Sequence, residues 1–231
     1  MDSEKRDEVL RAFKTLIQQI KDIDQRTATE YPQIKLLGRD CYLWKGYVVK
    51  SSPNKWNFKT NHELKILKYL NLKDNSNYFP ELITDVTVGN RVFLLLRYFP
   101  VPNLSMMFYK YRWQKYKLFP GAIRNIEREG KIILNKLLGL GIIHRDITPE
   151  NLLYDFWRHH LILIDFGFAV HEGEKIQTDI PETKELLEDI LQHHLGGNYR
   201  KPGIEFSYET DKYSFEMIIK ELKQMSFWSR L

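Results

Sequence analysis

The residues with the clearest chemical potential lie in two short segments in the second half of the chain. Residues 142–153 read IIHRDITPENLL, where a His-Arg-Asp triplet ends at Asp146 and Asn151 follows five residues later. Residues 161–168 read LILIDFGF, where Asp165 begins an Asp-Phe-Gly triplet. A carboxylate can take a proton from a hydroxyl, and amide and carboxylate oxygens are ligands that Mg²⁺ accepts. These residue types predict a site that combines a carboxylate with oxygen ligands for Mg²⁺.

The elements expected to position these residues are a β-hairpin and the helix before it. Two apolar segments, Leu152–Tyr154 and Leu161–Ile164, are separated by a polar turn at 155–160, which predicts the hairpin. A helix is predicted from about Ala122 to Leu138, ended by a glycine-containing turn. The hairpin would bring the amide of the first segment and the aspartate of the second to its two ends.

The first hundred residues are predicted to form a β-rich region with one internal helix. The expected strands are Gln33–Leu37, Cys41–Lys45, Tyr47–Lys50, Leu82–Val88 and Arg91–Tyr98, and the expected helix covers residues 58–71. Gly46 is predicted to form a tight turn between two of the strands. Pro100 and Pro102 mark a loop, after which the pattern becomes mainly helical, so a boundary is expected near 99–104.

Residues 4–25 are predicted to form an amphipathic helix. Apolar side chains recur at helical spacing from Val9 to Ile23, which indicates one apolar face. We favour packing of this face against the body of the protein. Docking of the helix to a partner or a membrane surface is the alternative that the pattern leaves open.

The order His-Arg-Asp, asparagine, hairpin and Asp-Phe-Gly resembles the protein kinase superfamily, and the resemblance covers about residues 33–225. It implies an α+β, bilobal protein kinase-like fold. The implied division is an N-terminal amphipathic helix over 1–25, an N-lobe over 26–99 and a truncated helical C-lobe over 100–231. The N-lobe would hold a small antiparallel sheet and a C-helix.

The resemblance implies roles for the residues of the second half. Asp146 would lie beside the acceptor hydroxyl as a catalytic residue, together with Arg145 of the same motif. Asn151 and Asp165 would bind Mg²⁺. The residues expected to support this site structurally are His144, Gly167 and Asp211.

The resemblance also implies an ATP site in the N-lobe. Lys50 ends the strand Tyr47–Lys50, where its buried ammonium needs an anionic partner, and Glu63 lies 13 residues on in the expected C-helix. An ion pair between them would let Lys50 reach the α- and β-phosphates, and both count as catalytic residues. The other expected ATP-binding residues are Leu96 as gatekeeper, the backbone of Arg97 and Phe99, and Gly38.

The sequence departs from the family pattern at several points. No G-x-G-x-x-G loop is present, and only Gly38 stands in its place. Thr148 occupies a position where serine/threonine kinases usually carry lysine, and Lys201-Pro202-Gly203 replaces A-P-E. The chain stops about ten residues after the helix led by Asp211, so we expect the later C-lobe helices to be missing. Residues 181–194 are predicted to be helical.

These features predict an ATP- and Mg²⁺-dependent kinase that transfers the γ-phosphate to a hydroxyl, with a protein Ser/Thr as the leading acceptor. A saccharide kinase of the same fold, acting on lipopolysaccharide or surface glycan, is one alternative. A pseudokinase scaffold is another. The expected partners are ATP and a protein or saccharide acceptor, and no nucleic acid.

Composition and charge narrow the remaining choices. The 231 residues are 43% hydrophobic, which excludes a disordered or collagen-like chain. Cys41 is the single cysteine, so no internal disulfide can form and a reducing, cytoplasmic location is expected. The formal net charge of +5 suits phosphate-bearing ligands, and residues 105–136 are locally basic. We expect no signal peptide and no transmembrane segment, and we leave peripheral membrane association open.

Overall fold

The computed structural model divides the chain into two compact units. It describes residues 3–19, 34–38, 41–52, 57–107, 120–174, 199 and 206–228. The first unit consists of Met1–Leu72 and Glu81–Tyr98, and the second of Lys73–Pro80 and Phe99–Leu231. Residues 73–80, which we expected in the N-lobe, therefore belong with the second unit.

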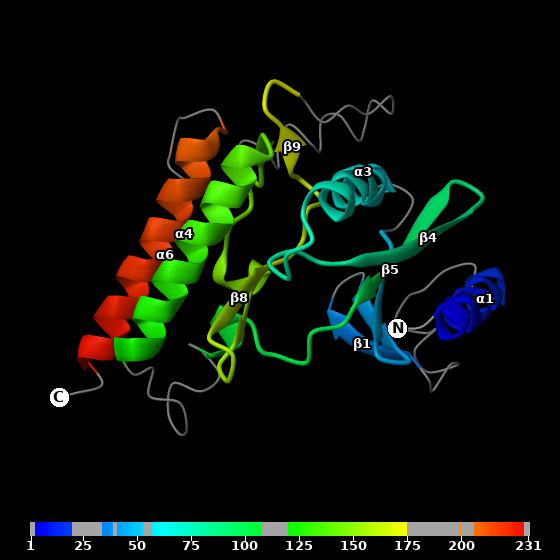
Figure 1. Cartoon of the computed structure of the whole chain (residues 1–231), viewed down its shortest axis with the longest axis horizontal. Coiled ribbons are helices and arrows are strands. Elements are labelled where there is room, and N and C mark those ends of the chain that lie inside the picture. The colour runs from blue at the N-terminus through cyan, green and yellow to red at the C-terminus, as the bar shows by residue number, and fades with distance from the viewer. Residues whose placement is uncertain are drawn as a thin grey trace. The chain divides into compact units, whose positions relative to one another are not determined.

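The first unit is built on a five-stranded antiparallel sheet with the order β1-β2-β3-β5-β4 (Figure 1). Its strands are β1 Ile34–Gly38, β2 Cys41–Trp44, β3 Tyr47–Lys50, β4 Leu82–Val88 and β5 Arg91–Arg97. Lys45 and Gly46 both have positive φ, 48° and 78°, so they form the two-residue turn whose twist matches a β-hairpin. The predicted tight turn at Gly46 is confirmed.

A helix packs against one face of this sheet. Phe13, Leu16 and Ile17 of α1 (Ser3–Gln19) join one buried cluster with sheet residues that include Val49 and Phe93. The apolar face of α1 is therefore buried within the first unit, as we favoured from its sequence pattern.

A second helix, α3 (Asn57–Lys73), belongs to the side of the sheet that faces away from this cluster. Successive side chains of a strand point to opposite faces, so Lys50 faces away from Val49 and toward α3. Burial on both faces explains why β5 is apolar without interruption from Val92 to Leu96.

The second unit contains two long helices that run side by side, α4 (Pro120–Gly139) and α6 (Tyr208–Trp228) (Figure 1). They approach closely where Phe215 of α6 covers Gly130 of α4. A Cβ atom at Gly130 would lie 1.8 Å from Cζ of Phe215. Glycine in the middle of a helix is unfavourable by about 1 kcal/mol relative to alanine, so its presence here is explained by this contact.

Two short antiparallel ladders frame the motifs singled out in the sequence. β6 (Ile142–Ile143) pairs with β9 (Val170–His171), and β7 (Leu152–Asp155) pairs with β8 (His160–Leu163). The short 3-10 helix Pro149–Asn151, η3, precedes β7. The predicted hairpin is confirmed as β7–β8. The β6–β9 ladder was not predicted, because two-residue strands leave no periodic pattern.

Several predictions lie outside the described residues. These are the end of the first helix over 20–25, the helix over 181–194 and the Lys201-Pro202-Gly203 segment. The described helices and strands otherwise begin and end within a few residues of the predicted positions.

Candidate active site

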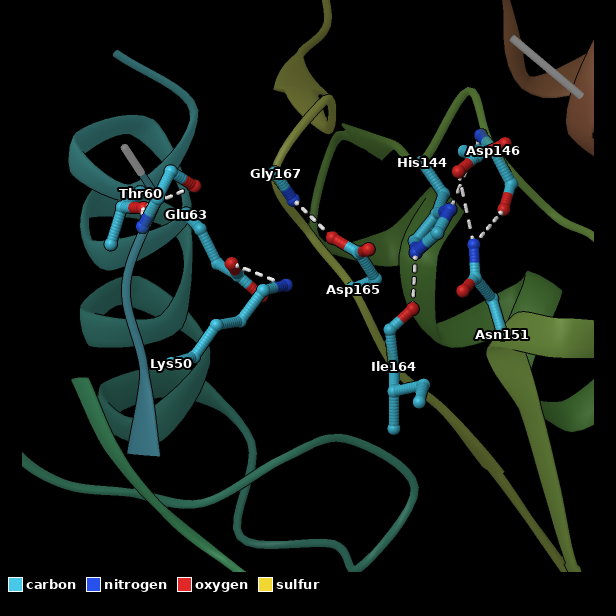
Figure 2. Close-up of polar contacts among 10 residues, drawn as sticks. Lys50, Thr60, Glu63, His144, Asp146, Asn151, Ile164, Asp165 and Gly167 are labelled. Atoms are coloured by element: carbon cyan, nitrogen blue, oxygen red, sulfur yellow. Dashed lines mark hydrogen bonds and ion pairs between the residues drawn. The ribbon is translucent and has the colours of Figure 1, made fainter. Parts of the chain in front are cut away.

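Lys50 and Glu63 form a buried ion pair in the first unit. Nζ of Lys50 lies 2.9 Å from Oε1 and 2.7 Å from Oε2 of Glu63, and the two side chains are only 8% and 1% exposed. Figure 2 shows the two side chains pointing at one another from β3 and α3. Removing a charge from water is unfavourable, so either of these buried side chains would be strongly destabilising at its position without the other.

The sequence positions this pair through two periodicities. Lys50 is the last residue of β3 and lies opposite Leu94 of β5. Glu63 belongs to a buried stripe of α3 spaced three or four residues apart, formed by Thr60, Glu63, Ile66, Leu67 and Leu70. The strand therefore supplies the cation and the helix supplies the anion from positions buried for packing reasons.

The other residues expected to bind ATP lie mostly on the same sheet. Leu96 is buried on β5, and Gly38 ends β1 opposite Cys41. The Arg97 N–H donates to the Glu81 carbonyl oxygen at 2.9 Å, so this N–H is already paired within the first unit. Phe99 begins the second segment of the second unit.

In the second unit, Asp211 fixes the backbone of the His-Arg-Asp motif. Its carboxylate accepts hydrogen bonds from the N–H groups of His144 at 2.6 Å and Arg145 at 2.9 Å. Burial raises the pKa of Asp211 to about 7, while the two N–H donors and the Arg145 guanidinium act to lower it. The loop that carries Asp146 is thus attached to α6 through one buried carboxyl group.

His144 connects this loop to the segment that carries Asp165. Its Nε2 lies 3.1 Å from the Ile164 carbonyl oxygen, and its Nδ1 accepts the Asp146 N–H at 3.3 Å. These partners assign the proton to Nε2. The ring also meets Phe166 edge to face, with centroids 4.8 Å apart.

Asn151 is oriented by Asp146. Its Nδ2 donates to the Asp146 carbonyl oxygen at 2.9 Å and to Oδ2 of the Asp146 carboxylate at 3.0 Å. Since both bonds involve the amide nitrogen, the amide oxygen is directed away from Asp146 (Figure 2). The Asp146 carboxylate and the Asn151 side chain are therefore held in a fixed mutual orientation.

Asp165 has a backbone conformation that few residues adopt. Its φ is 64°, and its Oδ1 accepts a long hydrogen bond from the Gly167 N–H at 3.4 Å. Aspartate is among the few non-glycine residues that tolerate the left-handed region, and strain of this kind gathers at functional sites.

The donor set of the second unit fits Mg²⁺ bound together with phosphate. Mg²⁺ is usually held by one or two carboxylates together with substrate phosphates and waters. The Asn151 amide and the Asp165 carboxylate would supply such a partial set. Within the described ranges, no group of three or more His, Cys, Asp or Glu side chains is placed to hold a metal by itself.

Arg145 is the remaining predicted catalytic residue. Its backbone has a φ of 71°, and its guanidinium lies over the Phe206 ring at 5.5 Å. Nε and Nη1 are buried and make no hydrogen bond to any residue that the structure describes. Burial lowers the pKa of Arg145, while the charge of the Asp211 carboxylate acts to raise it, so the structure places Arg145 beside Asp211.

Comparison with known proteins gives several relatives that are named as kinases. No protein-family model matches the chain. Serine/threonine-protein kinase CBK1 of Debaryomyces hansenii is 29% identical over 145 residues, which is 60% of this chain and 19% of that protein. Serine/threonine-protein kinase ppk21 of Schizosaccharomyces pombe is 30% identical over 137 residues, 56% of this chain and 23% of that protein. A human ribosomal protein S6 kinase-related protein is 37% identical over 90 residues, 38% of this chain and 21% of that protein.

These serine/threonine-protein kinases, at modest identity over about half of the chain, support a protein kinase-like superfamily for it. The chain spans less than a quarter of the length of these three relatives. The α+β class predicted from the motifs is confirmed by the five-stranded antiparallel sheet and the helices of the kinase-like chain.

One departure from the family pattern lies in the kinase-like loop itself. Thr148 begins η3 as its N-cap, with extended backbone angles and no side-chain capping bond. No cation therefore stands at this position of the loop.

In the part of the chain that the structure describes, no helix has the length and apolar character to cross a bilayer.

Sequence reasoning missed a polar cluster that ties residues 73–80 to the second unit of the kinase-like chain. His160 contacts the Glu129 carboxylate through Nδ1 at 3.1 Å and the Asn77 carbonyl oxygen through Nε2 at 3.0 Å. The Leu163 N–H donates to the Tyr78 carbonyl oxygen at 2.9 Å. The sequence feature that indicated this cluster was Glu129. It lies on the apolar side of α4, where a buried acidic side chain requires a polar partner.

Proposed function

We propose that this chain transfers the γ-phosphate of ATP, bound with Mg²⁺, to a hydroxyl group of an acceptor. The observation that carries the proposal is the fixed orientation of Asp146 and Asn151 in a loop that Asp211 anchors. Phosphoryl transfer depends on positioning and on neutralising phosphate charge, and this loop provides a positioned carboxylate together with an amide oxygen that is directed away from it.

Each site residue has a defined role in the proposed reaction. Asp146 orients the acceptor hydroxyl and takes its proton as the oxygen forms a bond to the γ-phosphorus. The bond from that phosphorus to the bridging oxygen breaks, and ADP leaves with its electron pair. Lys50, held by Glu63, binds the α- and β-phosphates. Asn151 and Asp165 hold Mg²⁺, which neutralises phosphate charge when bound.

A serine or threonine hydroxyl of a protein is the leading acceptor. Its support comes from the relatives, several of which bear the name serine/threonine-protein kinase. A saccharide hydroxyl is the second candidate, favoured by Thr148, because the loop then offers no lysine at the position where serine/threonine kinases usually carry one. A reducing, cytoplasmic location belongs to the same proposal and rests on the single cysteine.

A transfer assay tests the proposal. The protein is incubated with [γ-³²P]ATP and Mg²⁺, either with generic protein acceptors or with a cell glycan extract. We expect label on protein, dependent on Mg²⁺ and absent from Asp146→Asn protein. Label confined to the glycan fraction would reassign the acceptor. No turnover with any acceptor, and no autophosphorylation, would refute the enzyme in favour of a binding scaffold.

A further inference from the structure

Three side chains at successive turns connect α3 to the rest of the first unit. Asn57, Thr60 and Glu63 are three residues apart, and each bonds to the sheet or to the residues that follow β3. These three residues form the polar part of the α3 face that packs within the first unit, and the rest of that face is apolar. The N-terminal half of α3 is therefore located by directional bonds, which fix rotation as well as distance.

The contact between Thr60 and Ser52 is fully buried and uses each polar atom. The Ser52 N–H donates to Oγ1 of Thr60 at 3.0 Å, and the Thr60 hydroxyl donates to Oγ of Ser52 at 2.8 Å. Neither residue is more than 1% exposed. If α3 moved away, the Ser52 N–H and both hydroxyls would be left buried without partners, which is strongly unfavourable.

The bonds on the sheet side complete this connection. The backbone ladder between β3 and β5 ends at Lys50 opposite Leu94. Beyond it, the Ser51 hydroxyl donates to the Val92 carbonyl oxygen at 2.8 Å, and Nε of Arg91 donates to Oγ of Ser51 at 2.9 Å. The Val92 N–H donates to Oδ1 of Asn57 at 3.1 Å. Side chains thus replace the ladder just beyond Lys50 and link it to α3.

We propose that Thr60 and Ser52 form a positioning clamp that holds α3 where Glu63 meets Lys50, without an activating event. The ion pair alone does not fix the helix firmly, because desolvation offsets most of its attraction. Thr60 lies one turn before Glu63, so the helix cannot rotate Glu63 away until the two buried hydroxyl bonds break. The catalytic consequence of the clamp rests on the proposed function, whereas the clamp itself does not.

The first test measures the ion pair directly in protein without nucleotide. The rate of reductive methylation of Lys50 is followed by mass spectrometry, with the exposed Lys65 as internal reference. We expect Thr60→Val to speed Lys50 methylation about tenfold, because valine keeps the shape and removes the hydroxyl. Thr60→Ser keeps the hydroxyl and should restore the slow rate. Thr15→Val on α1, which loses only an exposed backbone bond, is the matched control.

The second test separates positioning from general damage to the fold. If Thr60→Val lowers the fraction of molecules with the pair formed, KM for ATP should rise about tenfold while kcat at saturating ATP changes less than about threefold. A merely structural role would instead reduce the active concentration and leave KM unchanged. Ser52→Ala, which keeps the Ser52 N–H bond to Thr60, should give a smaller effect of the same kind.

The outcomes separate the clamp from the proposed function. Unchanged methylation of Lys50 in folded Thr60→Val and Ser52→Ala proteins would overturn the clamp, whatever the activity. Faster methylation in protein that shows no turnover would support the clamp and count against the enzyme. If Thr60→Val does not fold, Ser52→Ala carries the same comparison against wild type, and its unchanged methylation rate overturns the clamp.

Discussion

Lys50 and Asp211 are both almost completely buried, at 6% and 1% exposed, yet the two units stabilise them by different means. In the first unit, Lys50 meets the carboxylate of one other side chain, Glu63. In the second, Asp211 meets backbone N–H groups of two consecutive residues. Because the partner of Lys50 is the Glu63 side chain, a double substitution can remove both charges together. Backbone donors remain whatever side chains are changed, so Asp211 has no compensating substitution.

The difference also concerns what each contact positions. The ion pair fixes two side-chain termini, and its location depends on the helix that carries Glu63. The Asp211 carboxylate fixes the backbone of a loop, from which the side chains of Asp146 and Asn151 then extend. The first arrangement is sensitive to movement of an element, and the second to the protonation state of one carboxyl group.

The largest effect is expected where chemistry alone is changed. Asp165→Asn and Asp146→Asn should each lower kcat by about a thousandfold or more, with unfolding midpoints close to wild type. Asp146→Asn should change ATP affinity by only about threefold, because its role is on the acceptor side. Turnover and nucleotide binding are measured in parallel. Near-normal turnover of Asp165→Asn would exclude its metal role, and a collapse of ATP affinity in Asp146→Asn would exclude its acceptor role.

The next effect tests whether the ion pair behaves as a replaceable unit. Lys50→Met should lower the free energy of unfolding by about 3–5 kcal/mol, because it removes the cation that neutralises the buried Glu63 carboxylate. The double substitution with Glu63→Leu should recover most of this loss. Urea denaturation measures both. Lys68→Met, which breaks the more exposed pair with Asp85, is the control and should cost about 1 kcal/mol or less. A double variant as unstable as the single one would contradict this view.

Asp211 should make stability depend on pH in the opposite sense to an ordinary paired aspartate. Its pKa is raised from 3.8 to about 7, so the native state binds the proton more tightly than the unfolded chain. The stabilising contribution is complete below the unfolded pKa and is lost as pH rises through about 7. The stability difference between wild type and Asp211→Asn should therefore fall by up to about 4 kcal/mol between pH 4 and 8.

Urea denaturation of both proteins across this range checks the pH prediction. A difference that grows with pH would mean that the two N–H donors outweigh burial. In that case the Asp211 carboxylate would behave like the paired acids of other proteins, and the contrast between the two units would narrow.

The smallest effect concerns the helix that delivers Asp211. Gly130→Ala should destabilise the protein by about 1–3 kcal/mol, because the new methyl group overlaps the Phe215 ring. Gly121→Ala in the same helix has open space around it and should be neutral or stabilising by up to about 1 kcal/mol. Thermal unfolding compares the two. Equal effects would show that the close contact of α4 and α6 is not needed to hold Asp211.

The sequence predicted the elements whose signals are local. The turn at Gly46, the strand Tyr47–Lys50 and the hairpin after Asn151 each depend on residues within a few positions of one another, and each is present. The class of fold followed from the resemblance of the motifs in the second half of the chain to those of protein kinases. These successes share one cause, since periodicity and turn chemistry are properties of short segments.

The features that were missed depend on partners distant in sequence. Nothing local to Thr60 indicates Ser52 as its partner, and the pairing of Ile143 with Val170 joins strands of two residues. Gly130 was a usable signal, because a glycine in the middle of an apolar helix suggests close contact, but its partner Phe215 lies 85 residues away. The sequence pattern indicates that a residue is buried, and only the structure shows which residues it packs against.

The packing of α1 on the sheet has a consequence for synthesis of the protein. The buried cluster that contains Phe13 and Ile17 also contains Phe93 and Leu95 of β5, which the ribosome adds roughly 80 residues after Phe13. At a synthesis rate of about 5–20 residues per second, β5 is made on the order of 4–16 s after α1, and the five-stranded sheet cannot be complete before then. The first unit therefore closes late, through a contact of high sequence separation, and until then the apolar face of α1 is available to chaperones.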